Sequence, residues 1–408
     1  MKTILLISPY WKEKHRWMVS SVKLAELWQR LGYRVVALCM GEGSAEGGTG
    51  QAISDNPPSL KLRRAGRRAG SRGESCERIS DTLEIHRVPD FFLPDPWNYG
   101  IAFGFSGKAS KLARELKPDL IVVNKILFWS SFALLSLRLH GYRVILTTDA
   151  LVGITWWPRS RFAKICAAIY AWTLGWLILK AANRIVFFHP QPLPLLHRLG
   201  IAEKSIVIPT GIDLAPFPLT PVPSPDGRGE RGVRDVTTTY IGRLESVKGA
   251  DDFVAAALKV KRDHRELRVQ VVGWYKSDHP LVKAHGSEVS FTGLRDDVAN
   301  ILAATDIFVL PSYSEGLSNA LMEAMASGCA CIASDVGGNA FLIRSGVSGF
   351  LFPPGDCEAL AAHIRRLLED PAKRRSLGEA ARKRIEEQFS WESVGQQYKR
   401  VFEQWTES

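Results

Sequence analysis

The sequence predicts an α/β protein built from two doubly wound, parallel-sheet domains. Its 408 residues are more than one hydrophobic core usually organises, so two domains are expected. Short apolar runs alternate with helical patterns in both halves, and continuous apolar strands are typical of parallel sheets covered by helices on both faces. A stretch rich in Pro and Gly at residues 209–235 interrupts the alternation, and the domain boundary is expected there.

The N-terminal domain is expected to span residues 1–205. Its predicted strands are 4–8, 35–39, 120–124, 144–148 and 184–188. Its clearest helices are predicted at 19–32, which ends at Gly32, and at 107–117, which ends before Pro118. Residues 41–78 are rich in Gly, Ser and Arg, so a solvated, mobile insertion is expected, with an RNA- or lipid-binding arm as the alternative.

The second half repeats this rhythm after a predicted linker at 206–235. Residues 236–390 are expected to form the C-terminal domain, with helices at 251–264 and 297–304. Its predicted strands are 237–242, 268–273, 289–293, 306–311 and 330–335.

Composition limits the classes of function. Residues 1–200 hold 28 Lys and Arg against 14 Asp and Glu, whereas the other 208 residues hold 25 against 28. A basic N-terminal half favours a polyanionic partner, either nucleic acid or an anionic membrane surface. The six cysteines show no zinc-binding spacing and are interpreted as free thiols in a reducing cytosol. The longest apolar run, at 165–179, is shorter than the ~20 residues that span a bilayer, so an integral membrane protein is not expected.

The stretch YIGRLESVKGADDF, residues 240–253, predicts an anion site. Gly242 allows a tight turn at the end of a strand, and Arg243 and Lys248 follow it. In open α/β sheets ligands bind at the carboxyl ends of the strands, where these two cations could hold a diphosphate. A solvated charge cluster is the alternative interpretation.

The stretch SEGLSNALMEAMASG carries two glutamates, Glu315 and Glu323. Ser318 is a plausible N-cap, and the free N–H groups of the helix start form an anion site that Gly316 leaves open to close approach. Glu323 could accept hydrogen bonds from a ribose diol, as acidic residues do in dinucleotide-binding folds, and Glu315 would face the other end of the ligand. Exposed helix and loop charges are the alternative.

These motifs resemble those of the retaining GT-B-fold glycosyltransferases of the "glycosyl transferases group 1" type, family 4. The matching stretches are IGRLESVKGADDFVAA, SFTGLRDDVANILAATDIFVLPSYSEGLSNALMEAMASG and SDVGGNAFLIRSGVSGFLFPPGD. The resemblance implies two Rossmann-like domains that face a cleft, with a C-terminal helix at 391–408 completing the first. It also implies donor-binding residues in the second domain, which are Gly242, Arg243, Lys248, Glu315, Gly316, Leu317, Ser318, Asn319 and Glu323.

Within the family pattern, Glu323 is expected on the ribose, Arg243 and Lys248 on the diphosphate, and Glu315 near the transferred sugar as a catalytic-site residue. The first loop, SPYWKEKHRW, departs from the family because it lacks the usual glycine pair. The family often carries a catalytic-site histidine after the fourth strand, where this chain has Asp149, to which we assign that role; a turn or N-cap aspartate is the alternative.

Chemistry separates this arrangement from a hydrolase. Cations and a helix N-terminus beside both glutamates are expected to keep them ionised, which does not suit a general acid. No metal site is expected, because Arg243 and Lys248 can neutralise a UDP or GDP leaving group, and the nucleotide-sugar is the donor substrate rather than a cofactor.

The acceptor is expected to be a glycan or a lipid-linked, membrane-borne molecule. Residues 154–184 place Trp156, Trp157, Trp172 and Trp176 near Arg159, Arg161 and Lys164, which suits peripheral binding at the cytoplasmic face of the inner membrane. A buried core helix is the alternative, and nucleic acid is not expected because no reading module is present. Two alternative functions remain, a GT-B phosphorylase or sugar-nucleotide epimerase and a catalytically inactive membrane-associated subunit.

Overall fold

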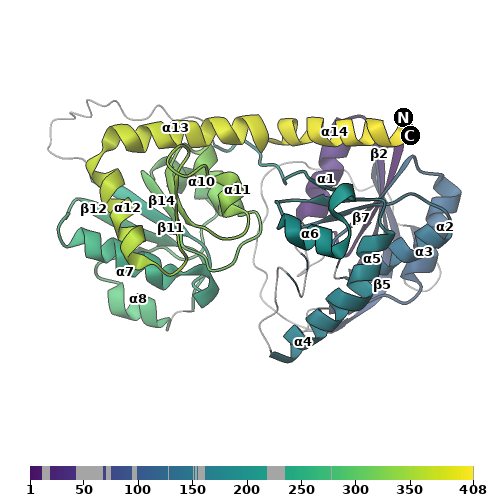
Figure 1. Ribbon diagram of the computed structural model, residues 1–408, viewed down its shortest axis with the longest axis horizontal. Coiled ribbons are helices and arrows are strands. Elements are labelled where there is room, and N and C mark those ends of the chain that lie inside the picture. Colours follow the sequence, from purple (N-terminus) through teal and green to yellow (C-terminus); the bar gives the residue numbers. More distant parts are fainter. Residues whose placement is uncertain are drawn as a thin grey trace. The chain divides into compact units, whose positions relative to one another are not determined.

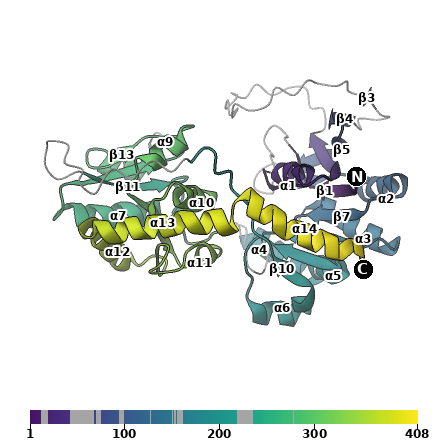
Figure 2. The same ribbon diagram turned by 90° about the horizontal axis from the view of Figure 1, so that it is seen from above.

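The computed structural model describes residues 1–11, 19–42, 68–69, 75–93, 99–126, 128–149, 151, 154, 161–217, 235–276 and 278–407. The chain divides into two compact units. Unit 1 comprises Met1–Ile208 with Gly395–Ser408, and unit 2 comprises Pro209–Val394. Each unit is an open sheet with helices on both faces (Figures 1 and 2).

Unit 1 is organised by one ten-stranded sheet in the order β10-β9-β8-β7-β1-β2-β5-β4-β3, with β6 paired to β5. The strands from β10 to β5 along this path are parallel, and the hairpin strands at the edge are antiparallel. The strands are β1 (Thr3–Ser8), β2 (Arg34–Glu42), β3 (Arg68–Ala69), β4 (Ser75–Ser80), β5 (Leu83–Leu93), β6 (Tyr99–Ile101), β7 (Leu120–Asn124), β8 (Ile145–Thr148), β9 (Arg184–Phe187) and β10 (Ser205–Val207).

The helices of unit 1 cover both faces because its central strands are apolar on both faces. In β1 the side chains of Leu5 and Ile7 enter the core beneath α2 and α3, and Ile4 and Leu6 are equally buried. The helices are α1 (Val19–Arg30), α2 (Phe105–Leu116), α3 (Ala133–Leu139), α4 (Arg161–Tyr170), a π-helical turn (Ala171–Gly175), α5 (Trp176–Ala181) and α6 (Leu193–Leu199), with short 3₁₀ turns at Trp129–Phe132 and Ala202–Lys204.

The last helix, α14 (Trp391–Glu407), supplies aromatic side chains to unit 1 from Gly395 onward. Trp28 of α1 is fully buried and packs edge-on against Tyr398 and Phe402, at ring-centroid distances of 5.8 and 5.6 Å. A Cβ at Gly395 would lie 3.0 Å from Leu27, so the absent side chain lets the two helices approach closely. Unit 1 is therefore completed by the C-terminal end of the chain.

The predicted insertion at 41–78 is wrong at its ends. Residues 41–42 finish β2, residues 68–69 form β3, and residues 75–78 belong to β4, which pairs with β5. The composition of this stretch hid its strand ends, because Gly, Ser and Arg dilute the apolar alternation on which the prediction depends. The remainder of the predicted insertion lies outside the described residues.

Unit 2 contains a six-stranded parallel sheet in the order β13-β12-β11-β14-β15-β16. Its strands are β11 (Val236–Ile241), β12 (Leu267–Val272), β13 (Ser290–Phe291), β14 (Ile307–Leu310), β15 (Ala330–Ser334) and β16 (Phe350–Phe352). Its helices are a 3₁₀ turn (Ser246–Lys248), α7 (Ala250–Lys261), α8 (Pro280–His285), α9 (Val298–Ala303), α10 (Asn319–Ala326), α11 (Asn339–Leu342), α12 (Cys357–Glu369) and α13 (Pro371–Gln388).

The first part of the predicted linker belongs to unit 2. Ile212 donates its backbone N–H to the carbonyl of Phe389 at 2.8 Å, and Phe217 is buried in the core on the α10 and α13 side of the sheet. Arg382 of α13 donates to the carbonyl oxygen of Phe217 at 2.5 Å. Residues 209–217 are therefore packed structure without regular elements, while residues 218–234 lie outside the described part of the chain.

Candidate active site

The strand order of unit 2 defines where a ligand is expected. Numbered from β11, the order is 3-2-1-4-5-6, the doubly wound arrangement in which the chain changes direction between the first and fourth strands. In doubly wound sheets the loops that follow these two strands border the ligand site at the carboxyl edge. The residues predicted to bind the donor lie on these two loops and on α10, which follows β14.

The loop after β11 carries the two predicted cations. A Cβ at Gly273, the first residue after β12, would lie 2.0 Å from the carbonyl oxygen of Gly242, so the turns after the two strands nearly touch. Arg243 is 60% exposed at its side chain and pairs with Glu245 at 3.0 Å. Its guanidinium therefore stays at the rim, where solvent screens the pair and an incoming phosphate can compete for it.

Lys248 contacts the second predicted motif directly. Its Nζ lies 2.7 Å from Oε1 of Glu315, and the hydroxyl of Ser312 donates to the same oxygen at 2.8 Å. The side chains of Lys248 and Glu315 are 24% and 10% exposed, so this pair is largely removed from water. The sequence predicted Lys248 on the diphosphate, and in this structure its ammonium also balances Glu315.

Backbone contacts fix the loop that bears Glu315. Tyr313 donates its N–H to the carbonyl of Val247 at 2.9 Å, which ties the loop to the β11 loop. On its other side, a Cβ at Gly337 would lie 1.9 Å from the carbonyl oxygen of Glu315, and Gly338 donates to the carbonyl of Gly316 at 2.9 Å. The glycine pair after β15 thus holds the Glu315 loop in place, and direct ligand contact is not needed to explain it.

The start of α10 has the predicted capped geometry. Ser318 is the N-cap and accepts a hydrogen bond from the N–H of Leu321 at 3.4 Å. Asn319 is exposed, Leu317 is half-buried, and no atom lies within 4 Å of a Cβ added at Gly316. Open space at Gly316 and unpaired N–H groups at a helix start are the features that suit a phosphate or a sugar hydroxyl.

Glu323 lies one turn into α10 and differs from the expectation. Burial raises the pKa of its carboxyl to about 7, and no side chain within the described part of the chain pairs with it. The expectation that neighbouring cations and the helix N-terminus keep both glutamates ionised was therefore wrong for Glu323. A largely buried carboxyl without a protein partner is costly, and a ligand diol would provide the missing hydrogen bonds.

Two exposed apolar side chains at the same edge of the unit 2 sheet were missed by sequence reasoning. Trp274 is 49% exposed and follows Gly273 at the end of β12, and Leu294 is 59% exposed and follows Gly293 at the end of β13. Their loops are joined by the hydrogen bond from the N–H of Gly273 to the carbonyl of Gly293, at 2.9 Å. Exposed apolar side chains at the carboxyl edge can support a nucleobase, and the signal was a large apolar residue directly after a glycine that follows the strand.

In unit 1, Asp149 lies directly after β8, at the carboxyl edge of the sheet. Its Oδ2 is 2.5 Å from Nζ of Lys125, the residue after β7, and its side chain is 47% exposed. Burial acts to raise the pKa of Asp149, but the charge and hydrogen bond of Lys125 outweigh it and the pKa is lowered. Asp149 is therefore held as a carboxylate, which accepts hydrogen bonds and does not donate a proton.

Lys125 is a further residue that sequence reasoning missed. Its backbone is left-handed at φ 73°, a conformation that is costly for a residue with a side chain, and its N–H donates to the carbonyl of Thr147 at 2.7 Å. The ammonium also lies 5.2 Å from the ring centroid of Phe188. Only the order β7-β8-β9 in the sheet brings Lys125 next to Asp149, so spacing along the chain gave no signal.

His189, after β9, completes this edge of unit 1. Its side chain is buried, burial lowers its pKa, and the negative charge of Asp149 only partly opposes that effect. Its Nδ1 lies 3.2 Å from the carbonyl oxygen of Pro190. The imidazole is therefore neutral at pH 7 and can act as a donor or an acceptor beside the Asp149 carboxylate.

Among the described residues, one group of three side chains could hold a metal ion. It lies away from the carboxyl edges of the two sheets. Cys76, Glu84 and His86 lie on the β4–β5 hairpin, with Nε2 of His86 2.8 Å from Oε1 of Glu84 and 3.8 Å from Sγ of Cys76. The Cys76 thiol donates to the same oxygen at 3.3 Å. Their side chains already satisfy one another, and the hairpin pairing that joins them was not visible from sequence spacing.

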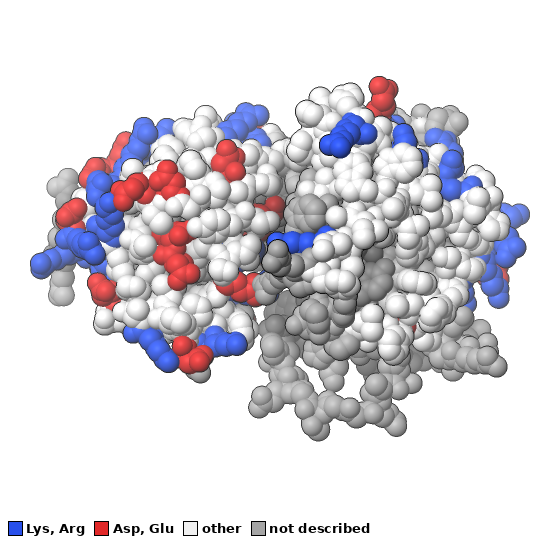
Figure 3. Space-filling view, turned by 60° about the horizontal axis from the view of Figure 1, so that its bottom comes forward, with Lys and Arg blue, Asp and Glu red and all other residues white. Residues whose placement is uncertain are grey.

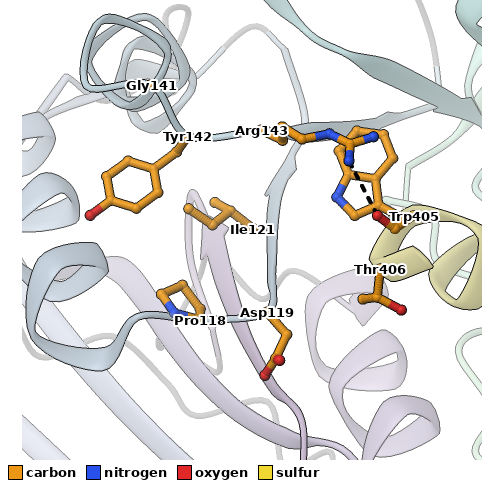
Figure 4. Close-up of a pocket in the computed structure, with 8 residues that line it drawn as sticks. All are labelled: Pro118, Asp119, Ile121, Gly141, Tyr142, Arg143, Trp405 and Thr406. Atoms are coloured by element: carbon orange, nitrogen blue, oxygen red, sulfur yellow. Dashed lines mark hydrogen bonds between the residues drawn. The ribbon is translucent and has the colours of Figure 1, made fainter. Parts of the chain in front are cut away.

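A pocket at the opposite edge of the unit 1 sheet has a structural role (Figure 4). It lies at the amino ends of β7 and β8, where α/β folds do not bind their substrates. Arg143 closes it by placing its guanidinium 4.3 Å from the ring centroid of Trp405 and donating to the carbonyl of Trp405 at 3.3 Å. Its lining seats the end of α14 on unit 1 and comprises Pro118, Asp119, Ile121, Gly141, Tyr142, Arg143, Trp405 and Thr406.

Comparison with known proteins places this geometry in a family. Residues 19–216 match the family described as "Glycosyltransferase Family 4", and residues 235–370 match "Glycosyl transferases group 1". The chain belongs to the group 1 glycosyltransferases. The predicted family and the predicted GT-B fold are therefore confirmed.

Two relatives and one solved structure illustrate the breadth of this family. The chain is 27% identical over 339 residues to an uncharacterized glycosyltransferase of Methanocaldococcus jannaschii, covering 79% of this chain and 85% of the relative. It is 29% identical to the UDP-Gal:alpha-D-GlcNAc-diphosphoundecaprenol alpha-1,3-galactosyltransferase of Escherichia coli, covering 52% of this chain and 58% of the relative. Sucrose-phosphate synthase from Thermosynechococcus elongatus has the same fold, with a TM-score of 0.70, 23% identity and 99% of both chains covered.

Proposed function

We propose that this glycosyltransferase moves a sugar from a UDP- or GDP-sugar to a membrane-borne or cell-envelope glycan or glycolipid, with retention of anomeric configuration. The observation that carries the donor half of this proposal is Glu323. It is a largely buried carboxyl with no described protein partner, one turn into the helix that follows the switch-point strand β14. A ribose diol supplies the two donors that such a carboxylate lacks.

The diphosphate would lie between the Arg243 and Lys248 loop and the start of α10. The exposed Arg243 can exchange Glu245 for phosphate oxygens, and the largely buried Lys248 can contact a phosphate while it holds Glu315. Two protein cations and a helix N-terminus stabilise the charge that develops on the leaving diphosphate, so we propose that no metal ion is needed.

We assign catalytic-site roles to Glu315 in unit 2 and to Asp149 in unit 1. Both are held by a lysine, Glu315 by Lys248 and Asp149 by Lys125. A carboxylate with a fixed partner orients sugar hydroxyls by accepting their hydrogen bonds and stabilises positive charge at the anomeric carbon. The acceptor hydroxyl would attack on the face that the diphosphate leaves, which keeps the configuration.

The distribution of charge supports the proposed acceptor and location. Acidic and basic side chains are intermixed on unit 2, while the same view shows few acidic side chains on unit 1 (Figure 3). The name of the Escherichia coli relative specifies an acceptor on diphosphoundecaprenol, a lipid-linked polyanion. We therefore propose a cytoplasmic enzyme that works at the cytoplasmic face of the inner membrane on an acceptor of this chemical class.

A donor panel tests the function. The full chain is incubated with UDP- and GDP-sugars, and release of the nucleoside diphosphate is followed with and without a polyprenyl-diphosphate-linked glycan. The proposal expects one donor to raise the melting temperature and to turn over faster when acceptor is added. Turnover that requires inorganic phosphate, or an epimerised sugar as product, would identify a phosphorylase or an epimerase. Failure to bind any nucleotide would identify an inactive subunit.

A further inference from the structure

In the helical segment from α4 to α5 the large apolar side chains are exposed, whereas a helix of a soluble domain normally buries them. The buried face of the segment carries small residues, namely Ala167, Ala171 and Gly175. Large apolar residues at spacings of three and four face outward, and we call them the outer row. The outer row consists of Phe162, Ile165, Ile169, Trp172 and Trp176, with exposed fractions of 63, 59, 61, 46 and 39%.

This segment runs as one helix from Arg161 to Ala181, with a π-helical turn in its middle, and Figure 1 shows α4 projecting away from the sheet. Its part Lys164–Ala181 is long and apolar enough to cross a membrane, with a mean hydropathy of 1.3, and only 28% of it is buried. An exposed apolar stripe of this length is rare on a soluble monomer and marks a surface that something else covers.

Basic residues accompany the outer row, and acidic residues are absent from this part of the sequence. Between Asp149 and Glu203 the chain has no Asp or Glu and six Lys or Arg. Two of these cations lie beside the tryptophans of the outer row, with the Arg198 guanidinium 5.2 Å from the ring centroid of Trp172 and Lys180 Nζ 5.9 Å from that of Trp176. Tryptophan rings with neighbouring cations are typical of side chains at the headgroup level of a bilayer.

From this combination we infer that the outer row inserts into the headgroup and acyl boundary of an anionic bilayer, with α4 and α5 lying in the plane of the membrane. A soluble protein partner would leave the six Lys and Arg residues without opposite charge unless that partner were acidic. A second copy of the chain would bring two basic surfaces together, since the net charge is +11. Anionic phospholipid satisfies both the apolar row and the cations.

The helix lies on the membrane and does not span it. Ile178 and Leu179 of α5 belong to the core of unit 1, and the hydroxyl of Tyr170 donates to the carbonyl of Ile126. A spanning orientation would pull these groups out of the fold and expose the core beneath them. The predicted contributions of Trp156, Trp157 and Arg159 lie outside the described residues.

This inference deepens the proposed function, because Asp149 lies on the connection between β8 and α4 and would be delivered to the surface that holds a lipid-linked acceptor. Its test is separate from that function. The full chain is sedimented with vesicles of zwitterionic phosphatidylcholine, or of phosphatidylcholine with 30% phosphatidylglycerol as an anionic lipid. Wild type is expected to sediment with the anionic vesicles, and binding is expected to fall when salt is raised.

The deciding variant is Ile165→Glu with Ile169→Glu, and Leu139→Glu is its matched control. Leu139 is 88% exposed on the same unit, so its replacement adds a charge at an exposed apolar site outside the outer row. We expect the double variant to lose at least about tenfold in vesicle partitioning, because insertion scales with apolar area, while the control binds as wild type does. All three proteins should bind the nucleotide equally. The vesicle result can therefore be interpreted even if the donor panel fails.

Three results would overturn the inference. One is wild type left in the supernatant with anionic vesicles at low salt. Another is equal sedimentation of wild type and the double variant. The third is a wild-type dimer in light scattering that the double variant abolishes without any lipid dependence, which would assign the outer row to a second copy.

Discussion

Lys248 and Glu315 form an ion pair across the switch point of unit 2, with Nζ 2.7 Å from Oε1, and the two residues come from the loops after β11 and β14. The pair joins the element that would hold the diphosphate to the element that would hold the sugar. Because both side chains are largely buried, removal of either one leaves the other without its counter-charge.

The pair predicts opposite effects of its two neutral variants on UDP binding. Lys248→Gln should weaken UDP binding about tenfold, because it removes a charge-assisted contact to phosphate. Glu315→Gln should leave UDP affinity equal or raise it, because Lys248 is released from its partner, while turnover falls on the order of 10²-fold. Calorimetry with UDP and steady-state rates with the full donor check both. Equal loss of UDP affinity in the two variants would show that the pair is only structural.

Glu323 makes donor binding depend on pH. Burial raises the pKa of its carboxyl to about 7 in the free protein, and a diol donates two hydrogen bonds to the ionised form. Binding should therefore release a proton, and affinity for UDP should rise between pH 6 and pH 8. Calorimetry in buffers of different ionisation enthalpy counts that proton. In Glu323→Gln the affinity should be lower and the pH dependence absent, and a flat wild-type profile would place the ribose elsewhere.

The glycine pair after β15 should affect donor affinity, because it holds the Glu315 loop in place. Gly337 has φ 50°, and a Cβ there would lie 1.9 Å from the carbonyl oxygen of Glu315. Gly337→Ala should displace that loop and cost donor affinity on the order of tenfold or more. Gly346→Ala is the control, because Gly346 has φ 79° but no atom within 4 Å of the added Cβ. It should lower the melting temperature through backbone strain and leave UDP affinity unchanged.

Lys125 should set the pH range in which Asp149 works. Asp149→Asn is expected to lower turnover on the order of 10²-fold with UDP affinity unchanged, because Asp149 lies outside unit 2. Lys125→Met removes the charge and hydrogen bond that lower the pKa of Asp149, so the pKa of that carboxyl rises. The acidic limb of the turnover profile should then move to higher pH. A simple loss of rate with an unmoved limb would make Lys125 a structural residue.

The strands and helices that position unit 2 could be predicted because each one is a local signal. The run from Asp306 to Pro311 is apolar and bounded by a charge and a proline, and β14 occupies Ile307–Leu310. Ser318 was predicted as an N-cap from residue type alone and forms that cap. Continuity of the apolar run and cap chemistry need no knowledge of distant residues.

The features that were missed or mispredicted from the sequence depend on residues that come into contact only after folding. The Lys125–Asp149 pair requires β7 and β8 to be neighbours, and the Cys76–His86 contact requires a hairpin. The protonation of Glu323 was mispredicted because burial, which the sequence does not state, outweighs the nearby helix N-terminus. Residue types and spacing therefore predict local elements such as β14 and the Ser318 cap better than the electrostatic states of buried carboxyls.

The same carboxyl should make stability depend on pH in the free protein. The folded pKa of Glu323 is about 7 and its unfolded value is 4.5, so the folded state binds more protons between these values. The stabilising contribution of the protonated form is complete below about pH 4.5 and is lost as pH rises through about 7. Glu323→Gln, which cannot ionise, should therefore match wild type at pH 4 and exceed it at pH 8.

The size of that effect follows from the shift, at most about 3 kcal/mol of unfolding free energy at pH 8. Urea unfolding at the two pH values measures it, and Glu358→Gln is the control because Glu358 is exposed and paired with Lys259 on the surface. Saturating UDP should reduce the difference in unfolding free energy between Glu323→Gln and wild type at pH 8, since the bound diol provides the hydrogen bonds that the ionised carboxylate lacks. If Glu323→Gln were no more stable than wild type at pH 8, the carboxylate would already be solvated and would not need hydrogen bonds from a ligand.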